Sequence, residues 1–225
     1  MQARHEYKHS ISYSDYAVLR SKLRQVMRRD PHARTDGTYR VRSLYFDTPA
    51  DKALREKIDG VNHREKFRIR RYPGAPDGTI LLEKKSKING LCYKQSAILF
   101  AEQVQALLVG DVAWMMRDER PLLRELYTKM RSELLRPKTI VEYIREPLVF
   151  LAGNVRVTFD RKICTGLGSL DFLNDDVPLL PAGDCPVLLE VKYDQFLPDE
   201  IAALLQLGAR RAQACSKYAL CRGYD

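Results

Sequence analysis

The 225-residue chain has no long apolar run. A membrane-spanning helix needs roughly 20 consecutive apolar residues, and no stretch of the sequence approaches that length. The first residues, 1–6, also lack the apolar region of a signal peptide. We therefore predict a cytoplasmic protein without an integral membrane segment.

The sequence also lacks the spacings that mark disulfide or zinc sites. Its five cysteines are an odd, dispersed set without a Cys-x-x-Cys pair, which favours reduced thiols. Its four histidines have no metal-ligand spacing, so we interpret them as surface or packing residues. The positions are Cys92, Cys164, Cys185, Cys215 and Cys221, and His5, His9, His32 and His63.

No linker rich in serine or glycine, no low-complexity run and no internal repeat divides the chain. With 45% hydrophobic residues, it has the composition of a folded protein. We predict one domain over residues 1–225. The net charge of +9 indicates an anionic partner, which at this point can be nucleic acid, phospholipid or a small polyanion.

The segment Val187–Tyr193 contains the most informative pattern. Apolar residues alternate with a second face that carries Glu190 and Lys192, which predicts a β-strand. A carboxylate and an ammonium on such a strand are costly unless a charged group meets them. The strand therefore suggests a charged ligand.

Similar alternation and turn signals predict a mixed α+β chain. Asn89-Gly90 and Gly153-Asn154 indicate hairpin turns, and Ser12 with Asp15 resembles a helix capping box. The other predicted strands are 4–10, 39–46, 66–72, 81–87, 91–98, 139–150 and 155–161. The predicted helices are 12–29, 48–58, 101–109, 120–134, 198–207 and 216–221.

The charged strand faces have two interpretations. Taken singly, each is more often a solvated outer face. Five strands, however, concentrate lysine and arginine, four of them together with an isolated carboxylate, and the amphipathic helices need an apolar sheet surface to cover. The carboxylates are Glu6, Glu83, Asp160 and Glu190. We therefore predict an eight-stranded antiparallel β-barrel tunnel with helices packed outside, whose charged interior binds a polyphosphate and a divalent metal.

An ordered set of motifs leads to the same interpretation. It resembles the VTC domain, the polyphosphate polymerase catalytic domain within the triphosphate tunnel metalloenzyme (CYTH-like) superfamily. The resemblance extends from Arg4 to Cys221. The motifs are Arg4-x-Glu6-x-Lys8, Ser43-Leu44-Tyr45-Phe46-Asp47, Arg68-Ile69-Arg70, Glu83-x-Lys85-x-Lys87, Tyr143-x-Arg145, Arg156-x-Thr158-x-Asp160, Leu189-Glu190-Val191-Lys192 and Ser216-Lys217-Tyr218.

The resemblance implies transfer of the ATP γ-phosphate to an inorganic polyphosphate chain, with Mn²⁺ or Mg²⁺ as cofactor. By position in the motifs, the catalytic residues are Lys8, Arg68, Arg70, Lys85, Arg145 and Arg156. The substrate-binding residues are Arg4, Arg42, Lys66, Lys87, Lys94, Lys192, Ser216 and Lys217. The metal ligands are Glu190 and Glu6; for Glu6, Glu83 and Asp160, simple pairing with neighbouring cations is an equal alternative. Tyr143 and Thr158 are expected to form hydrogen bonds in the tunnel.

Three other functions stay open at this point. Triphosphatases of the superfamily commonly begin with Glu-x-Glu-x-Lys, and Arg4 replaces the first glutamate here, which favours a polymerase over an inorganic or nucleoside triphosphatase. A polyanion-binding module without turnover is a further alternative. Nucleic acid is disfavoured as a partner, because Phe67 and Phe159 fall on the faces opposite the charges and cannot serve there as stacking platforms. The sequence leaves an unidentified protein partner open.

Overall fold

The structure, a computed structural model, describes residues 4–75, 78–206 and 215–223. Its helices are α1 (Tyr13–Val26), α2 (Lys52–Ile58), α3 (Ala101–Leu108), α4 (Pro121–Ser132), α5 (Asp199–Leu204) and α6 (Lys217–Cys221), with short 3-10 turns at Ala113–Arg117 and Ala152–Asn154. Its strands are β1 (His5–Ile11), β2 (Arg28–Arg29), β3 (Tyr39–Asp47), β4 (Arg64–Arg71), β5 (Ile80–Ile88), β6 (Leu91–Leu99), β7 (Arg136–Phe150), β8 (Val155–Thr165), β9 (Leu180–Pro181) and β10 (Val187–Tyr193).

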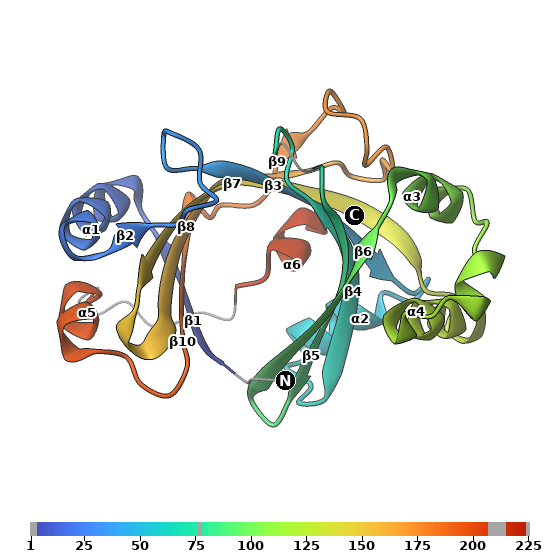
Figure 1. The fold of residues 1–225 in the computed structure, drawn as a ribbon, viewed down its shortest axis with the longest axis horizontal. Helices are drawn as coiled ribbons and strands as arrows, with labels where there is room; N and C mark the ends of the chain where they lie inside the picture. Colours follow the sequence, from blue (N-terminus) through green and yellow to red (C-terminus); the bar gives the residue numbers. More distant parts are fainter. Residues whose placement is uncertain (1–3, 76–77, 207–214, 224–225) are drawn as a thin grey trace.

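Eight of these strands form one antiparallel sheet that curls around a central space (Figure 1). The order across the sheet is β1-β10-β8-β7-β3-β4-β5-β6, and the short strands β2 and β9 pair with β7 and β8. The two edges are joined at one isolated antiparallel bridge between Arg4 and Cys92. This arrangement confirms the expected α+β fold with an eight-stranded antiparallel barrel.

The alternation within the strands decides which residues face the helices. In β10, Leu189 and Val191 are buried on the outer face, in the apolar cluster that includes Leu19 and Leu23 of α1 and Ile201 of α5. A second outer cluster packs β3, β4 and β5 against α3 and α4. Because the outer face is apolar, Glu190 and Lys192 point to the concave side, as the sequence predicts.

One helix differs from the expected outer position. α6 lies on the concave side of the sheet (Figure 1), where Tyr218 and Cys221 share an apolar cluster with Val41, Tyr143 and Leu188. Charged groups therefore line only part of the interior. Five residues are too few to show an amphipathic period, so the residue pattern did not predict this inward position.

Three predicted helix boundaries also differ. The capping box at Ser12 is confirmed, but α1 ends at Val26, because residues 28–29 pair with β7 instead. The helix expected from residue 48 begins at Lys52, after Asp51 with a φ of 55°. The helix expected over 198–207 is α5, which ends at Leu204; residue 207 lies outside the described residues. Within the described part of the chain, no helix has the length and apolar character to cross a membrane.

Candidate functional site

A cavity of about 640 Å³ opens on the concave side of the sheet. It lies between β1 and β10 on one side and β4, β5 and β6 on the other, with α2 and the start of α6 contributing side chains. Its cationic lining consists of Arg4, Lys8, Lys57, Arg64, Lys66, Arg68, Arg70, Lys85, Lys87, Lys94, Arg145, Lys192 and Lys217. The carboxylates that line it are Glu6, Glu65 and Glu190. The cavity therefore has a large excess of positive charge.

Fourteen predicted site residues are brought together here, and their predicted roles remain predictions. They are Arg4, Glu6, Lys8, Lys66, Arg68, Arg70, Lys85, Lys87, Lys94, Arg145, Glu190, Lys192, Ser216 and Lys217. Sequence reasoning missed Arg64 and Lys57. The signal for Arg64 was present, since it continues the alternation of Lys66, Arg68 and Arg70, but the strand was predicted to begin two residues too late.

Asp160 orients two of the cations without lining the cavity. It is fully buried, and its two carboxylate oxygens accept hydrogen bonds from Nε and Nη2 of Arg145, both at 2.7 Å. Lys217 Nζ lies 2.5 Å from the same carboxylate. Such a bidentate pair fixes the plane of a guanidinium. The geometry therefore favours the pairing interpretation of Asp160 over metal ligation.

On the opposite side of the cavity, Glu83 orients the guanidinium groups of Arg68 and Arg70. It is fully buried, and its Oε2 lies 2.7 Å from Nε of Arg68 and 3.7 Å from Nη1 of Arg70. Lys94 Nζ lies 2.5 Å from its other oxygen. Burial alone would raise the pKa of Glu83, but these cations lower it below its ordinary value. Glu83 is therefore an ionised anchor for the two arginines.

Tyrosine hydroxyls complete the hydrogen bonds of these arginines. Arg68 donates to the Tyr45 hydroxyl at 2.9 Å, and Arg70 donates to the Tyr143 hydroxyl at 3.2 Å and to Ser43 Oγ at 3.2 Å. Tyr143 thus forms the kind of hydrogen bond expected for it. The guanidinium groups are held in place from behind, and the remaining donors face the cavity.

Glu190 and Glu6 lie on neighbouring strands and share two lysines. Lys8 Nζ is 3.5 Å from Glu190 and 3.6 Å from Glu6, and Lys192 Nζ is 3.5 Å and 3.3 Å from the same two carboxylates. Lys217 Nζ lies 2.7 Å from Glu190. Burial would raise the pKa of Glu190, but Lys217, Lys8 and Lys192 outweigh burial and keep it well below its ordinary value.

This pair of carboxylates fits a divalent metal with few protein ligands. Glu6 Oε1 is buried and accepts no hydrogen bond from a described residue, but it is ion-paired with Lys8 and Lys192, so a metal ion would compete with these lysines for it. Across the described residues there is no group of three or more ligating side chains. Mg²⁺ commonly binds through one or two carboxylates and takes its other ligands from substrate phosphates and water. Glu190 and Glu6 could hold such an ion only together with a phosphate ligand.

Two cavity lysines, Lys85 and Lys66, lack enough negative charge around them. The proximity of Lys192, together with burial, lowers the pKa of Lys85 well below its ordinary value. Burial lowers the pKa of Lys66 to about 8. The positive charges of the cavity are thus incompletely balanced by its carboxylates. An anionic ligand would relieve this repulsion.

Two predicted site residues lie elsewhere. Arg42 is fully buried outside the cavity, where Nε donates to Glu142 Oε2 at 2.6 Å and the other nitrogens bind backbone carbonyls of residues 172–175. Its strand alternates so that Ser43 and Tyr45 face inward and Arg42 faces outward. Arg156 also lies outside the cavity, because its guanidinium binds Asp30 at 2.7 Å and the Tyr39 hydroxyl at 2.9 Å. The predicted substrate-binding role of Arg42 is therefore corrected to a structural one. Arg156 lies on the inner face of β8, in register with Lys192, and its predicted catalytic role stays a prediction.

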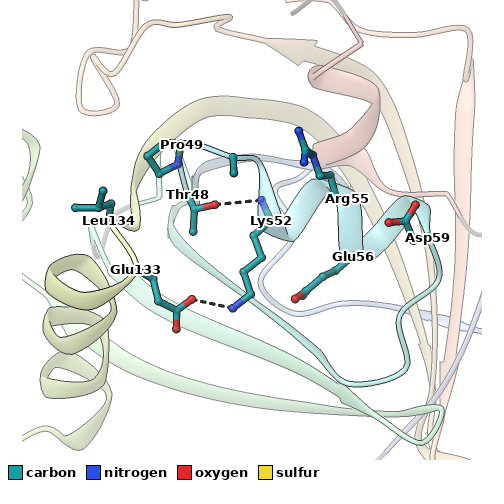
Figure 2. A pocket seen from close by; sticks show the side chains of 9 residues that line it. Thr48, Pro49, Lys52, Arg55, Glu56, Asp59, Glu133 and Leu134 are labelled. Atoms are coloured by element: carbon teal, nitrogen blue, oxygen red, sulfur yellow. Dashed lines mark hydrogen bonds and ion pairs between the residues drawn. The ribbon is translucent and has the colours of Figure 1, made fainter.

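A second hollow lies outside the barrel, between α2 and the end of α4, and has a different character. Figure 2 shows Lys52 and Glu133 directed toward each other across it, with Nζ and Oε2 2.9 Å apart. Glu56, Asp59 and Arg55 also line it. Because its three carboxylates outnumber its two cations, this hollow lacks the positive charge excess that would favour a polyanion.

The chain is similar in fold to several solved structures. A putative adenylyl cyclase from Hippeastrum, described as having a dominant triphosphatase activity, has a TM-score of 0.58 at 15% identity, covering 100% of this chain and 96% of the other. A putative adenylate cyclase from Bacillus halodurans has a TM-score of 0.52 at 12% identity, with coverage of 91% and 87%. The PH1819 protein from Pyrococcus horikoshii has a TM-score of 0.51 at 13% identity, with coverage of 99% of each chain.

Sequence comparison gives the family. No curated protein sequence is significantly similar to this chain. The family model of the VTC domain, however, matches residues 3–224, which is nearly its whole length. The curled antiparallel sheet and the basic interior agree with the resemblance seen in the sequence motifs. The chain belongs to the VTC domain family.

Proposed function

We propose that this protein is a metal-dependent polyphosphate polymerase that transfers the γ-phosphate of ATP to a growing inorganic polyphosphate chain. One observation carries the proposal: cations from β1, β4, β5, β10 and α6 converge on one cavity, where they outnumber the carboxylates that line it. Such a site suits a ligand with several adjacent negative charges. Membership of the VTC family supports this choice of ligand.

The chain's own residues would act by positioning and by neutralising charge, since phosphoryl transfer asks for little covalent chemistry from a protein. An oxygen of the terminal phosphate of the acceptor forms a bond to the γ-phosphorus. The bond from that phosphorus to the β–γ bridging oxygen breaks, and its electron pair leaves with ADP. Arg68, Arg70 and Arg145 are held by Glu83 and Asp160 in orientations that can bind the non-bridging oxygens. No side-chain nucleophile is required.

Glu190 and Glu6 would hold Mn²⁺ or Mg²⁺. The ion, when bound, would withdraw charge from the phosphate oxygens as a Lewis acid. Lys217 and Lys8, which pair with Glu190 in the absence of ligand, could then turn their ammonium groups toward phosphate. Lysine suits this change of partner, because its ammonium is a point charge on a flexible stem.

Product analysis tests the proposal. Purified protein incubated with ATP and Mn²⁺ is expected to form ADP and long, acid-insoluble phosphate chains. Lys85→Met is expected to reduce chain formation strongly, whereas the matched change Lys22→Met, at an exposed position on α1, should leave it unchanged. Release of free phosphate without chains would rule out a polymerase.

A triphosphatase is the second candidate. The position of Glu6 beside Glu190 favours it, because a second carboxylate in the cavity could help to bind an attacking water. The Hippeastrum protein of similar fold is also described as a triphosphatase. The same incubation separates the candidates, since hydrolysis of ATP yields ADP and orthophosphate and no chain. Binding of tripolyphosphate without either product would leave a polyanion-binding module.

A further inference from the structure

A buried carboxylate at the end of β3 has no contact with the cavity. Asp47 is the last residue of the strand and is 0% exposed. Its Oδ1 accepts hydrogen bonds from the backbone N–H groups of Thr48 at 2.8 Å and Ala53 at 2.9 Å. Its Oδ2 accepts from the N–H of Leu54 at 3.1 Å and from the Tyr218 hydroxyl at 2.7 Å. Asp47 thus ties the first turn of α2 to α6.

The Tyr218 hydroxyl is held from two sides. It donates to Asp47 and accepts from Nη1 of Arg222 at 2.9 Å, and Arg222 also binds Asp51 at 2.8 Å. Burial and the bond to Asp47 raise the pKa of Tyr218, which keeps the phenol protonated and able to donate. The Tyr218 ring stacks on the ring of Tyr45, with centroids 5.1 Å apart.

Lys217, the residue before Tyr218, reaches into the cavity. Its Nζ lies 2.7 Å from Glu190 and 2.5 Å from Asp160. Its helix has only five residues, and a helix this short has no stability of its own in water. The orientation of Lys217 therefore depends on the tertiary contacts of α6, and the bond between Tyr218 and Asp47 is a central one.

We propose that Asp47 and Tyr218 are positioning residues, whose hydrogen bond holds α6 so that the Lys217 ammonium enters the cavity. This inference rests on the proposed function, because it assigns the two residues to the same phosphate site. It also explains why the segments 43–47 and 216–218 meet, although Asp47 and Tyr218 are 171 residues apart in sequence.

The variant Tyr218→Phe removes only the hydroxyl and retains the ring that stacks on Tyr45. We expect binding of inorganic tripolyphosphate, measured by calorimetry, to weaken about tenfold, which corresponds to one hydrogen bond to a charged group. The matched control is Tyr16→Phe. The Tyr16 hydroxyl donates to Glu146 at 2.5 Å on the outer side of the sheet, so its loss should leave tripolyphosphate binding unchanged.

A double-mutant cycle separates positioning from a general structural role. In a Lys217→Met background, Tyr218→Phe should cause no further loss of binding, because the group that it positions is gone. Asp47→Asn should show the same dependence on Lys217. Unchanged binding by Tyr218→Phe, or an equal loss in both backgrounds, would overturn the inference.

The test is independent of turnover. A wild-type protein that binds tripolyphosphate but makes no chains would contradict the polymerase proposal, and the cycle would still report on Lys217. Conversely, chain formation by wild type together with an additive cycle would contradict only the positioning of Lys217 by Tyr218.

Discussion

Lys66 and Tyr45 form a titrating pair inside the cavity. Burial lowers the pKa of Lys66 to about 8. Burial acts to raise the pKa of Tyr45, but Arg68 and Lys66 outweigh burial and lower it to about 8. Lys8 and Glu6 of β1 also face Lys66. Both groups of the pair therefore change charge just above neutral pH.

This pair predicts a pH dependence of ligand binding. Bound tripolyphosphate favours the charged lysine, so the pKa of Lys66 is higher in the complex than in the free protein. Affinity should be full below the free pKa of about 8 and fall as pH rises above it, while Tyr45 gains a negative charge. Calorimetry between about pH 7 and about pH 9.5 measures this fall.

The matched variants assign the effect. The double variant Lys66→Arg with Tyr45→Phe removes both titrating groups and should bind with little change over the same range. If the affinity of the wild-type protein stays constant above pH 8, neither Lys66 nor Tyr45 interacts electrostatically with the bound tripolyphosphate.

Glu190 gives the second prediction at this scale. Glu190→Gln should abolish metal-dependent turnover, because the amide is a poor ligand for Mn²⁺. It should retain binding of metal-free tripolyphosphate, since the substitution removes a negative charge from the basic cavity. Turnover and calorimetry are measured on the same preparation. Full activity at saturating Mn²⁺ would place the metal site elsewhere.

The sequence predicted the site only where strand alternation was clear. Glu190 and Lys192 follow the period of a strand with an apolar outer face, so their inward direction could be inferred. Arg42 lies in a strand with charged and apolar residues on both faces, and its outward direction depends on the partners Glu142 and residues 172–175. Arg156 does lie on the inner face, in register with Lys192, but its guanidinium pairs with Asp30 and Tyr39 from distant segments, which strand alternation could not predict.

At the scale of the element, the two faces of a strand have different roles: one packs against helices and the other lines the cavity. In β4, Phe67 is buried in the outer cluster beneath α3 and α4, while its neighbour Lys66 lines the cavity. The outer face supplies apolar burial, and the inner face supplies charge. Because adjacent side chains point to opposite faces, the two tasks can be tested one residue apart.

Phe67→Ala and Lys66→Met are therefore a matched pair. Phe67→Ala should lower the free energy of unfolding by about 3–5 kcal/mol, because it leaves a cavity in the core. Lys66→Met should not lower the free energy of unfolding, since it removes a partly desolvated cation, but it should weaken tripolyphosphate binding. Urea denaturation and calorimetry distinguish the two effects. If instead Phe67→Ala weakened binding and Lys66→Met lowered the free energy of unfolding, the two faces of β4 would have the opposite orientations.

Long elements were predictable, and the short helix expected over 216–221 is present as α6, but the strand β2 and the inward position of α6 were not predicted. The hairpin at Asn89-Gly90 and the helix opening at Ser12 have local signals that the structure confirms. β2 has two residues and α6 has five, too few for a periodic pattern. Their positions are determined by tertiary contacts, such as pairing of residues 28–29 with β7.

At the scale of the whole molecule, the net charge of +9 is concentrated where it can act on one ligand. The curl of the sheet carries cations from six strands and two helices into the same cavity. The general architecture followed from the sequence because the helices needed an apolar surface to cover. The interior position of α6 did not follow from the sequence. This helix also reduces the space left for a ligand.

Ligand-linked stability is the prediction at this scale. Tripolyphosphate should raise the melting temperature, because it binds the folded cavity and not the unfolded chain; at 100 times Kd the gain is about 2.7 kcal/mol. Sodium chloride at equal ionic strength should raise the melting temperature much less, because chloride only screens the lysines. Thermal unfolding followed by circular dichroism measures both shifts. Equal shifts would indicate screening without a specific site.

The most direct test of the account is a crystal structure with a non-hydrolysable ATP analogue and Mn²⁺. The account predicts the triphosphate inside the barrel, with its non-bridging oxygens on Arg68, Arg70 and Arg145 and the metal on Glu190. A triphosphate bound outside the barrel, for example in the hollow at Lys52 (Figure 2), with no ligand in the cavity, would contradict it.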